Sequence, residues 1–300
     1  MSEILMRDQV EADELRLVQE LIEAAAKVDG QYAVSEQGRL LLRGGPRAGV
    51  RHLLLWDAGA IAGYAQLDGT DPVEPPAGEL VVHPERRAQG HGRKLGRALL
   101  DESGHRLRLW AHGGHPPARH LAQALGLTLF RELRQLRRPL GGLRTVEATL
   151  PAGVRVRTFV PGQDDAAWLA VNAAAFAHHP EQGSLTQRDL EARKAEPWFD
   201  PAGFFLAERQ EDGELLGFHW TKEHAAEGLG EIYVLGVSPA AQGLGLGRAL
   251  TTTGLRHLAA RPNLDTAMLY VDADNRTAVR LYESLGFRTF EVDLMYRTES

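Results

Sequence analysis

Glycine-rich turns that could hold an anion occur twice in this chain. Residues 82–95 read VHPERRAQGHGRKL, and residues 237–250 read VSPAAQGLGLGRAL. Each turn follows an apolar stretch and leads into a helix-forming run. Glycines at such a junction let backbone N–H groups approach a ligand closely, and the following helix start adds unpaired donors. The pattern therefore predicts two pyrophosphate-binding turns. Neither turn has the Gly-Lys-Ser/Thr of a Walker loop or the setting of a dinucleotide fingerprint.

Two turns about 155 residues apart indicate a duplicated domain. Around them we expect the same order of helices and strands in both halves, which predicts the α/β class with a mixed central sheet flanked by helices in each domain. The predicted domains are 1–140 and 153–300, with a linker at 141–152. Expected elements of the first half are a helix at 8–27, strands at 52–56, 61–67 and 79–82, a helix at 90–105, a strand at 107–111, a helix at 118–125 and a strand at 129–137. Expected elements of the second half are strands at 155–159, 204–209, 215–222, 231–237, 268–271 and 290–296, and helices from 164, at 245–260 and at 275–285.

Composition narrows the class of protein. The 300 residues carry a net charge of -6, with 43% hydrophobic and 25% charged residues, as in an ordinary globular protein that does not bind nucleic acid in general. The chain has no cysteine, which excludes disulfides, a thiolate nucleophile and thiolate metal sites. The N-terminus lacks the apolar core of a signal peptide. We therefore expect a cytoplasmic protein without a membrane partner.

The turns carry a resemblance to a known family. The pattern Arg/Gln-x-x-Gly-x-Gly fits both copies, and the second half adds Asn275, Ala278, Tyr282, Gly286 and Phe287 in the order Asn-x-x-Ala-x-x-x-Tyr-x-x-x-Gly-Phe. The chain thus resembles a tandem pair of GCN5-related N-acetyltransferases (the GNAT superfamily). The resemblance implies acetyl-CoA as cosubstrate and a small-molecule amine as acceptor. We expect no metal, because the histidines at 112, 115, 178 and 179 do not form a convincing set of ligands. We expect a monomer, because two domains in one chain could mimic the dimer of single-domain relatives.

Residue roles follow from that resemblance. It implies that Glu231 is the base that deprotonates the amine and that Tyr282 is the acid that protonates the departing thiolate. Counting back from the first turn gives Pro76 where the second half has Glu231, and Ala122 where it has Tyr282, so the first domain is expected to bind acetyl-CoA without turning it over. The implied acetyl-CoA contacts are Leu235, Gly236, Val237, Gln242, Gly243, Leu244, Gly245, Leu246, Gly247, Arg248, Asn275, Arg276, Thr277, Ala278, Val279 and Arg280 in the second half, and Leu80, Val81, Val82, Arg87, Ala88, Gln89, Gly90, His91, Gly92 and Arg93 in the first.

The acceptor is also suggested by resemblance. The runs at 173–183, 219–222, 230–237 and 269–275 are similar to those of tandem members that acetylate the cysteinyl amine of a cysteine–glucosamine–inositol conjugate. That similarity implies substrate contacts by Glu36, Glu181, Lys222, Glu231 and Tyr270, with Glu36 expected in a loop between helix and strand. Two other functions stay open: acetylation of another amine, such as an aminoglycoside, amino acid or polyamine, and acetyl-CoA sensing without catalysis.

Overall fold

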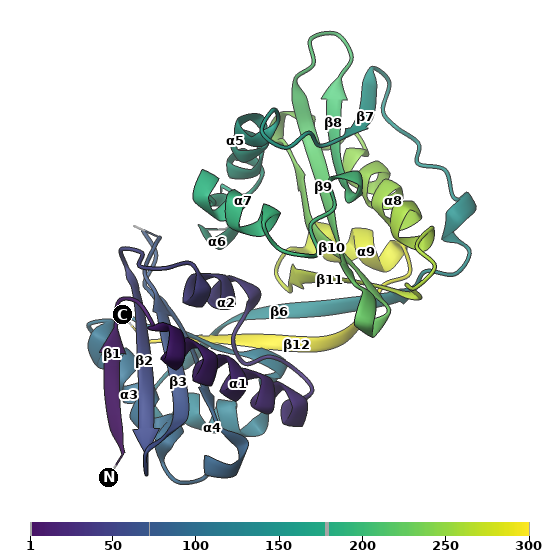
Figure 1. Cartoon of the computed structure of the whole chain (residues 1–300). Helices are drawn as coiled ribbons and strands as arrows, with labels where there is room; N and C mark the ends of the chain where they lie inside the picture. The colour runs from purple at the N-terminus through teal and green to yellow at the C-terminus, as the bar shows by residue number, and fades with distance from the viewer. Residues whose placement is uncertain (1, 72, 178–179, 300) are drawn as a thin grey trace. The chain divides into compact units, whose positions relative to one another are not determined.

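Two compact units make up the chain in the computed structural model (Figure 1). Unit 1 comprises Met1–Leu133 and Glu291–Ser300, and unit 2 comprises Arg134–Phe290. The structure describes residues 2–71, 73–177 and 180–299, apart from the side chains of 144, 180 and 181. No helix in these ranges is long and apolar enough to cross a membrane.

Unit 1 is a sheet with helices on both faces. Its strands lie in the order β1-β2-β3-β4-β5-β12, antiparallel except for β4 and β5. Helix α1 buries Val18, Leu21, Ile22 and Ala25, four positions on one side of the helix, and packs in the same core as Leu42 of α2. Helices α3 and α4 share the other core with β5 and β12. The elements are β1 (Glu3–Arg7), α1 (Ala12–Asp29), α2 (Glu36–Arg43), β2 (Val50–Asp57), β3 (Ala60–Asp68), β4 (Ala77–Val82), η1 (Pro84–Arg86), α3 (His91–Glu102), β5 (Arg108–Ala111), η2 (His112–Gly114), α4 (Pro116–Ala124) and β6 (Thr128–Pro139), whose second half belongs to unit 2.

Unit 2 repeats this architecture with the strand order β6-β11-β10-β9-β8-β7. One of its cores is aromatic: Trp168 of α5 contacts Phe204, Phe218 and Trp220 edge-on. The elements are η3 (Leu143–Thr145), β7 (Val154–Thr158), α5 (Asp165–Ala175), α6 (Pro180–Gly183), α7 (Gln187–Lys194), η4 (Pro201–Gly203), β8 (Phe204–Arg209), β9 (Leu215–His224), η5 (Ala225–Glu227), β10 (Leu229–Val237), η6 (Pro239–Ala241), α8 (Leu246–Ala259), β11 (Thr266–Asp272), α9 (Arg276–Ser284) and β12 (Arg288–Arg297), which ends in unit 1.

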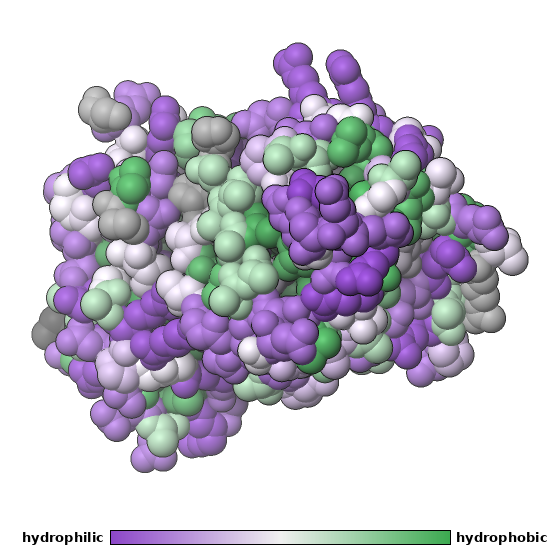
Figure 2. Space-filling view, turned by 90° about the horizontal axis from the view of Figure 1, so that it is seen from above, coloured by the Kyte–Doolittle hydropathy of each residue, from purple (hydrophilic) through white to green (hydrophobic). Residues whose placement is uncertain are grey.

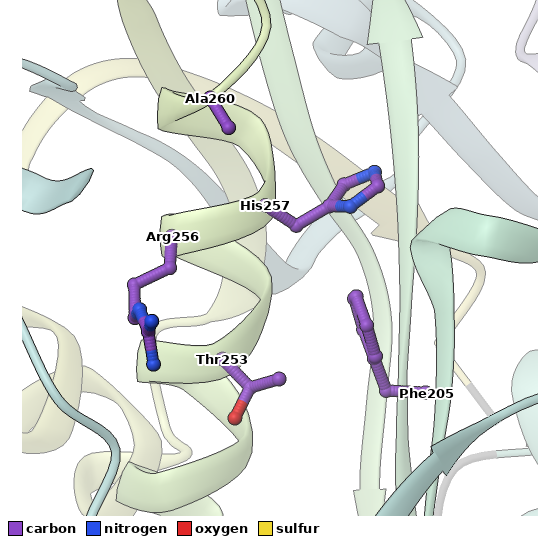
Figure 3. Close-up of a pocket in the computed structure, with 5 residues that line it drawn as sticks. All are labelled: Phe205, Thr253, Arg256, His257 and Ala260. Atoms are coloured by element: carbon purple, nitrogen blue, oxygen red, sulfur yellow. The ribbon is translucent and has the colours of Figure 1, made fainter.

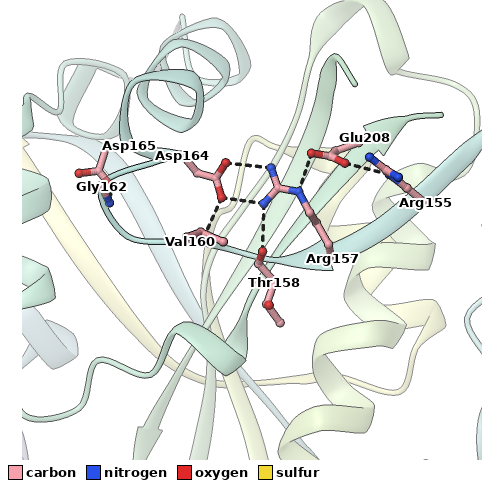
Figure 4. Close-up of polar contacts among 8 residues, drawn as sticks. All are labelled: Arg155, Arg157, Thr158, Val160, Gly162, Asp164, Asp165 and Glu208. Atoms are coloured by element: carbon pink, nitrogen blue, oxygen red, sulfur yellow. Dashed lines mark hydrogen bonds and ion pairs between the residues drawn. The ribbon is translucent and has the colours of Figure 1, made fainter. Parts of the chain in front are cut away.

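A partly buried ion-pair network holds the edge strand β7 in unit 2 (Figure 4). Arg157 donates two hydrogen bonds of 2.6 and 2.8 Å to Asp164 and a third, of 2.6 Å, to Glu208. Hydrogen bonds to Arg157 outweigh partial burial and lower the pKa of the Asp164 carboxyl. Asp164 also accepts from the backbone of Val160 at 2.7 Å, so the network fixes the turn that leads from β7 into α5.

The compact units differ from the predicted domains at two segments. Residues 134–140 belong to unit 2 rather than to the domain predicted at 1–140, and residues 291–300 belong to unit 1 rather than to the domain predicted at 153–300. Part of the predicted linker at 141–152 is also packed, since Leu143 lies in a core of unit 2. The reason is strand pairing: β12 pairs with β5, and β6 lies beside β11. The last strands of the two repeats are therefore exchanged.

Several elements were not predicted. The chain begins with a strand, β1, and helices α2 and α7 stand where no helix was expected. The loop predicted for Glu36 is wrong, because Glu36 is the first residue of α2, which Ser35 caps by accepting a hydrogen bond from the backbone N–H of Gly38. On the face drawn in Figure 2, hydrophilic residues predominate and hydrophobic ones lie among them in small groups, as is usual for a protein surface.

Candidate active site

The glycine-rich turn of unit 2 is shaped to present backbone donors. After η6, Gln242 is extended, and Gly243 and Gly245 adopt the left-handed conformation with φ of 80° and 79°. Gly245 is the N-cap of α8, and nothing lies within 4 Å of where a Cβ on either glycine would stand. The first N–H groups of α8 have no acceptor within the helix. The turn can therefore surround a phosphate with backbone donors.

The turn of unit 1 has the same backbone conformation. Arg87 is extended like Gln242, and Ala88 and Gly90 are left-handed with φ of 58° and 84°. Gly90 caps α3 as Gly245 caps α8. Arg87 differs in its side chain, which forms two hydrogen bonds of 2.7 Å with Asp29 of α1. Both copies thus keep an anion-binding backbone, while the Arg87 side chain is already engaged within unit 1.

Strand β10 separates from β11 and bulges in the middle. Its pairing with β11 ends at Ile232, and its pairing with β9 shifts register between Ile232 and Val234. Backbone groups from Tyr233 to Val237 on the β11 edge are thus outside that ladder. This stretch includes Leu235, Gly236 and Val237, three of the implied acetyl-CoA contacts, so the strand has backbone groups free of the β11 ladder at those positions.

The register corrects one comparison between the repeats. Strand β4 pairs with β3 without a shift, so the residue at the position of Glu231 is Ala77, not Pro76. The bulge at Tyr233 adds one residue to β10, which is why counting back along the sequence missed by one. Ala122 does occupy the place of Tyr282, since Leu127 and Phe287 donate backbone hydrogen bonds to Ala122 and Tyr282 in the same way.

Glu231, near the start of β10, is buried in unit 2. Its side chain is 9% exposed, and its carboxylate lies 2.7 Å from Nε2 of His224 at the end of β9. Lys222, directly opposite Glu231 in the β9–β10 ladder, has its ammonium over the rings of Trp198 and Tyr233, 4.5 and 5.3 Å from their centroids. His224 was not foreseen. Recognising the β9–β10 hairpin would have revealed it, because the turn at 225–228 brings it beside Glu231.

Tyr282 is buried on α9 among the side chains of a second core. Burial raises the pKa of its phenol to about 12, so the hydroxyl remains protonated at neutral pH. The ring packs edge-on against Phe287, with centroids 5.7 Å apart. Its hydroxyl has no hydrogen-bond partner among the residues that the structure describes. A protonated hydroxyl without a partner is suited to donate to a departing thiolate.

The other predicted site residues have varied settings. Tyr270 on β11 is 40% exposed and accepts a 2.8 Å hydrogen bond from Gln135, and it lies on the same face as Met268, the ladder partner of Glu231. Asn275 caps α9 by accepting a hydrogen bond from Ala278. Glu36 is in unit 1. The side chain of Glu181 lies outside the described residues.

Unit 1 contains a buried charge cluster that the sequence did not suggest. His112 lies between Glu79 of β4 and Asp293 of β12, with its ring nitrogens 2.8 and 3.2 Å from their carboxylates. Burial opposes the charged imidazole most strongly, but hydrogen bonds to Asp293 and Glu79 and their charges outweigh burial and raise the pKa of His112 to about 10. The imidazolium therefore joins β4 to the exchanged strand.

A hollow lies at the other end of α8 from the glycine-rich turn. Figure 3 shows its lining by Phe205, Thr253, Arg256, His257 and Ala260. Nearby, Asp200, Glu223 and His257 could bring ligand atoms within 4.8 Å of one another. Arg261 lies 2.5 Å from Asp200 and 2.7 Å from Glu223, so both carboxylates already have a cationic partner and are poor candidates for a metal site.

Comparisons with known proteins place these features in a family. The model of the acetyltransferase (GNAT) family matches residues 16–127 and 169–287, one stretch in each repeat. The chain belongs to the acetyltransferase (GNAT) family. It is an acetyl-CoA-dependent N-acetyltransferase with two tandem domains of that family, as the glycine-rich turns predicted.

Particular relatives are similar over nearly the whole chain. Mycothiol acetyltransferase of Streptomyces avermitilis is 75% identical over 93% of this chain and 90% of its own length. Those of Streptomyces griseus and Thermobispora bispora are 68% and 56% identical, over 99% and 92% of this chain and 96% and 93% of their own. Among solved structures, a GCN5-related N-acetyltransferase from Sphaerobacter thermophilus is 25% identical with a TM-score of 0.68, covering 98% of this chain and 95% of that one. A tandem GNAT protein from the clavulanic acid biosynthesis pathway shares the fold at 17% identity, with a TM-score of 0.73, covering 100% of this chain and 99% of that one.

Proposed function

We propose that this chain transfers the acetyl group of acetyl-CoA to the cysteinyl amine of 1D-myo-inositol 2-(L-cysteinylamino)-2-deoxy-α-D-glucopyranoside, giving mycothiol and CoA. The similarity to mycothiol acetyltransferases over nearly the whole chain carries this proposal. The buried Glu231, with Lys222 opposite it and Tyr270 on the same face, supports an acceptor that has both an ammonium and many hydroxyl groups.

Catalysis is assigned to unit 2. Glu231 takes a proton from the cysteinyl ammonium, directly or through a water, and the free amine attacks the thioester carbonyl. Backbone N–H groups of β10 beyond the bulge stabilise the oxyanion. The C–S bond then breaks, the CoA thiolate takes the proton of Tyr282, and the attacking nitrogen loses its second proton through solvent, which restores the Tyr282 phenol. The matching turn of unit 1 supports acetyl-CoA binding there, but unit 1 has Ala77 and Ala122 in place of the base and the acid.

The remaining parts of the proposal concern the site contacts and the state of the protein. Acetyl-CoA contacts β10, the glycine-rich turn and the start of α9, and Glu36, Glu181, Lys222 and Tyr270 contact the acceptor. The enzyme works as a cytoplasmic monomer, without nucleic acid, membrane or metal. The net charge of -6 supports the absence of nucleic acid, and the pairing of the carboxylates near His257 with Arg261 supports the absence of a metal.

One experiment tests the reaction and its residues together. Purified protein is mixed with acetyl-CoA and the desacetyl cysteinyl conjugate, and N-acetylated product is followed by mass spectrometry. We expect product from the natural chain. Glu231→Gln and Tyr282→Phe should each lower kcat on the order of 10²- to 10⁴-fold, because each removes one proton-transfer group. Full activity in both variants would reject the two roles, and no product from the natural chain would reject the acceptor.

A further inference from the structure

The β9–β10 hairpin sets His224 beside Glu231. The two strands are joined by η5 and by Gly228, whose φ is 69°. In the ladder Lys222 stands opposite Glu231, and His224 stands opposite Leu229. Residues two apart along a strand point to the same face, so Lys222, His224 and Glu231 share one face of the sheet. Glu231 therefore has one cationic or polar neighbour directly across and another on the diagonal.

These two neighbours of Glu231 have different contacts. The Lys222 ammonium lies over the Trp198 and Tyr233 rings, and Lys222 is only 8% exposed. His224 contacts the carboxylate itself, with 2.7 Å between Nε2 and Oε2 of Glu231. The His224 side chain is 24% exposed, so the imidazole lies between the buried carboxylate and the surface.

A buried carboxylate needs hydrogen-bond donors to keep its charge and its orientation. Among the described residues, His224 supplies the one side-chain hydrogen bond to the Glu231 carboxylate. Because that bond reaches Oε2, it leaves Oε1 for another partner. With Nε2–H donating, the carboxylate is held in one rotamer, and its second oxygen can receive a proton from an amine.

We infer that His224 is a positioning residue for Glu231: its Nε2–H holds the carboxylate so that the remaining oxygen meets the acceptor ammonium. The inference rests on the proposed function for the role of Glu231 as base. His224 itself exchanges no proton with the substrate in this scheme. The effect of replacing it should thus depend on whether the new side chain can donate a hydrogen bond from the same place.

Two substitutions distinguish the contribution of the hydrogen bond from that of the imidazole ring itself. His224→Ala removes the donor, and His224→Gln keeps an amide N–H at a similar reach. In the acetylation assay we expect kcat to fall tenfold or more in His224→Ala, about the lower part of what a general base contributes, and to stay within about threefold of the natural value in His224→Gln. The KM for acetyl-CoA should not change in either variant, because the glycine-rich turn is elsewhere.

Glu223→Gln is the matched control. Glu223 is the adjacent residue on β9, points to the opposite face, and pairs with Arg261 at 2.7 Å. This variant changes charge at the same end of the hairpin without touching Glu231, so its kcat should equal that of the natural chain. The inference is overturned if His224→Ala retains kcat, if His224→Gln loses as much as His224→Ala, or if Glu223→Gln behaves like His224→Ala.

A structural measurement keeps this test independent of the acceptor. Crystal structures of the three variants should show the Glu231 carboxylate in place in His224→Gln and Glu223→Gln, and turned away in His224→Ala. An unmoved carboxylate in His224→Ala would overturn the inference even if the acetylation assay succeeds. If the natural chain makes no product with the cysteinyl conjugate, the proposed acceptor fails, while the crystal structures still decide whether His224 positions Glu231.

Discussion

A single imidazole, that of His112, connects two strands of unit 1, β4 and β12. Both carboxylates that contact the His112 ring have further donors. Glu79 accepts a 3.0 Å hydrogen bond from the backbone N–H of Ser35 at the start of α2. Asp293 accepts hydrogen bonds from Gly113 at 2.6 Å and from Gln31 at 2.9 Å. Both carboxylates are therefore satisfied on several sides. The arrangement requires a protonated imidazole. A neutral ring carries a hydrogen on one nitrogen only, so it could donate to only one of the two carboxylates.

The charge on His112 makes the stability of unit 1 depend on pH. Its pKa is raised from 6.5 to about 10 in the folded state, so the stabilisation is complete below pH 6.5 and is lost as pH rises through 10. We expect the unfolding free energy of unit 1 to fall between pH 7 and 10, measured by hydrogen exchange of β4 and β5 amides. In His112→Gln the fall over this range should be smaller. An equal fall in both proteins would show that His112 is not its source.

The sequence could not have revealed this cluster, although it did reveal the turns. Glu79, His112 and Asp293 are separated by 33 and 181 positions, and only strand pairing brings them together. Glu231 and Tyr282 were proposed as catalytic residues because family spacing marks them. His224 has no such mark, since its role depends on the hairpin register. Local patterns therefore predicted the residues fixed by a motif and missed those fixed by tertiary contacts.

The two strand–turn–helix motifs have the same turn and the same start of the helix, but the strands that lead into them differ. The turns share their extended and left-handed residues, yet only β10 carries a bulge. The bulge re-aims the residues around Tyr233, and Arg193 of α7 donates a 2.9 Å hydrogen bond to the Tyr233 hydroxyl. The glycine spacing predicted both turns. A β-bulge has no comparable sequence pattern, so the bulge at Tyr233 led the count to Pro76 instead of Ala77.

Matched substitutions in the two turns should separate their roles. Gly245→Val and Gly90→Val place a β-branched residue at a left-handed N-cap, with φ of 79° and 84°, where such residues are strained. We expect Gly245→Val to raise the KM for acetyl-CoA at least tenfold and to lower turnover. Gly90→Val should leave kcat unchanged while weakening any acetyl-CoA binding by unit 1, followed by calorimetry. Loss of turnover in Gly90→Val to the same extent would contradict a catalytic role confined to unit 2.

In the whole molecule, the boundaries of the two compact units do not coincide with the boundaries of the two sequence repeats. Each sheet ends with a strand from the other repeat, β12 beside β5 and the second half of β6 beside β11. The sequence shows both last strands clearly, but the repeats resemble each other there, so nothing local states which strand pairs with which sheet. The predicted boundaries at 140 and 153 followed the order of the chain, and the exchange became visible only in the strand pairing.

Removal of the last ten residues tests this exchange. A chain ending at Phe290 loses Leu294 and Tyr296, which are 3% and 7% exposed in a core of unit 1, and it loses Asp293, a partner of His112. We expect amide protection in β5 and β4 to collapse, while amides of β8 and β9 in unit 2 keep theirs, measured by hydrogen exchange with mass spectrometry. Removal of Glu299 and Ser300 alone should change neither unit, because β12 ends at Arg297. Full protection of β5 in the chain ending at Phe290 would mean that unit 1 completes its sheet without β12.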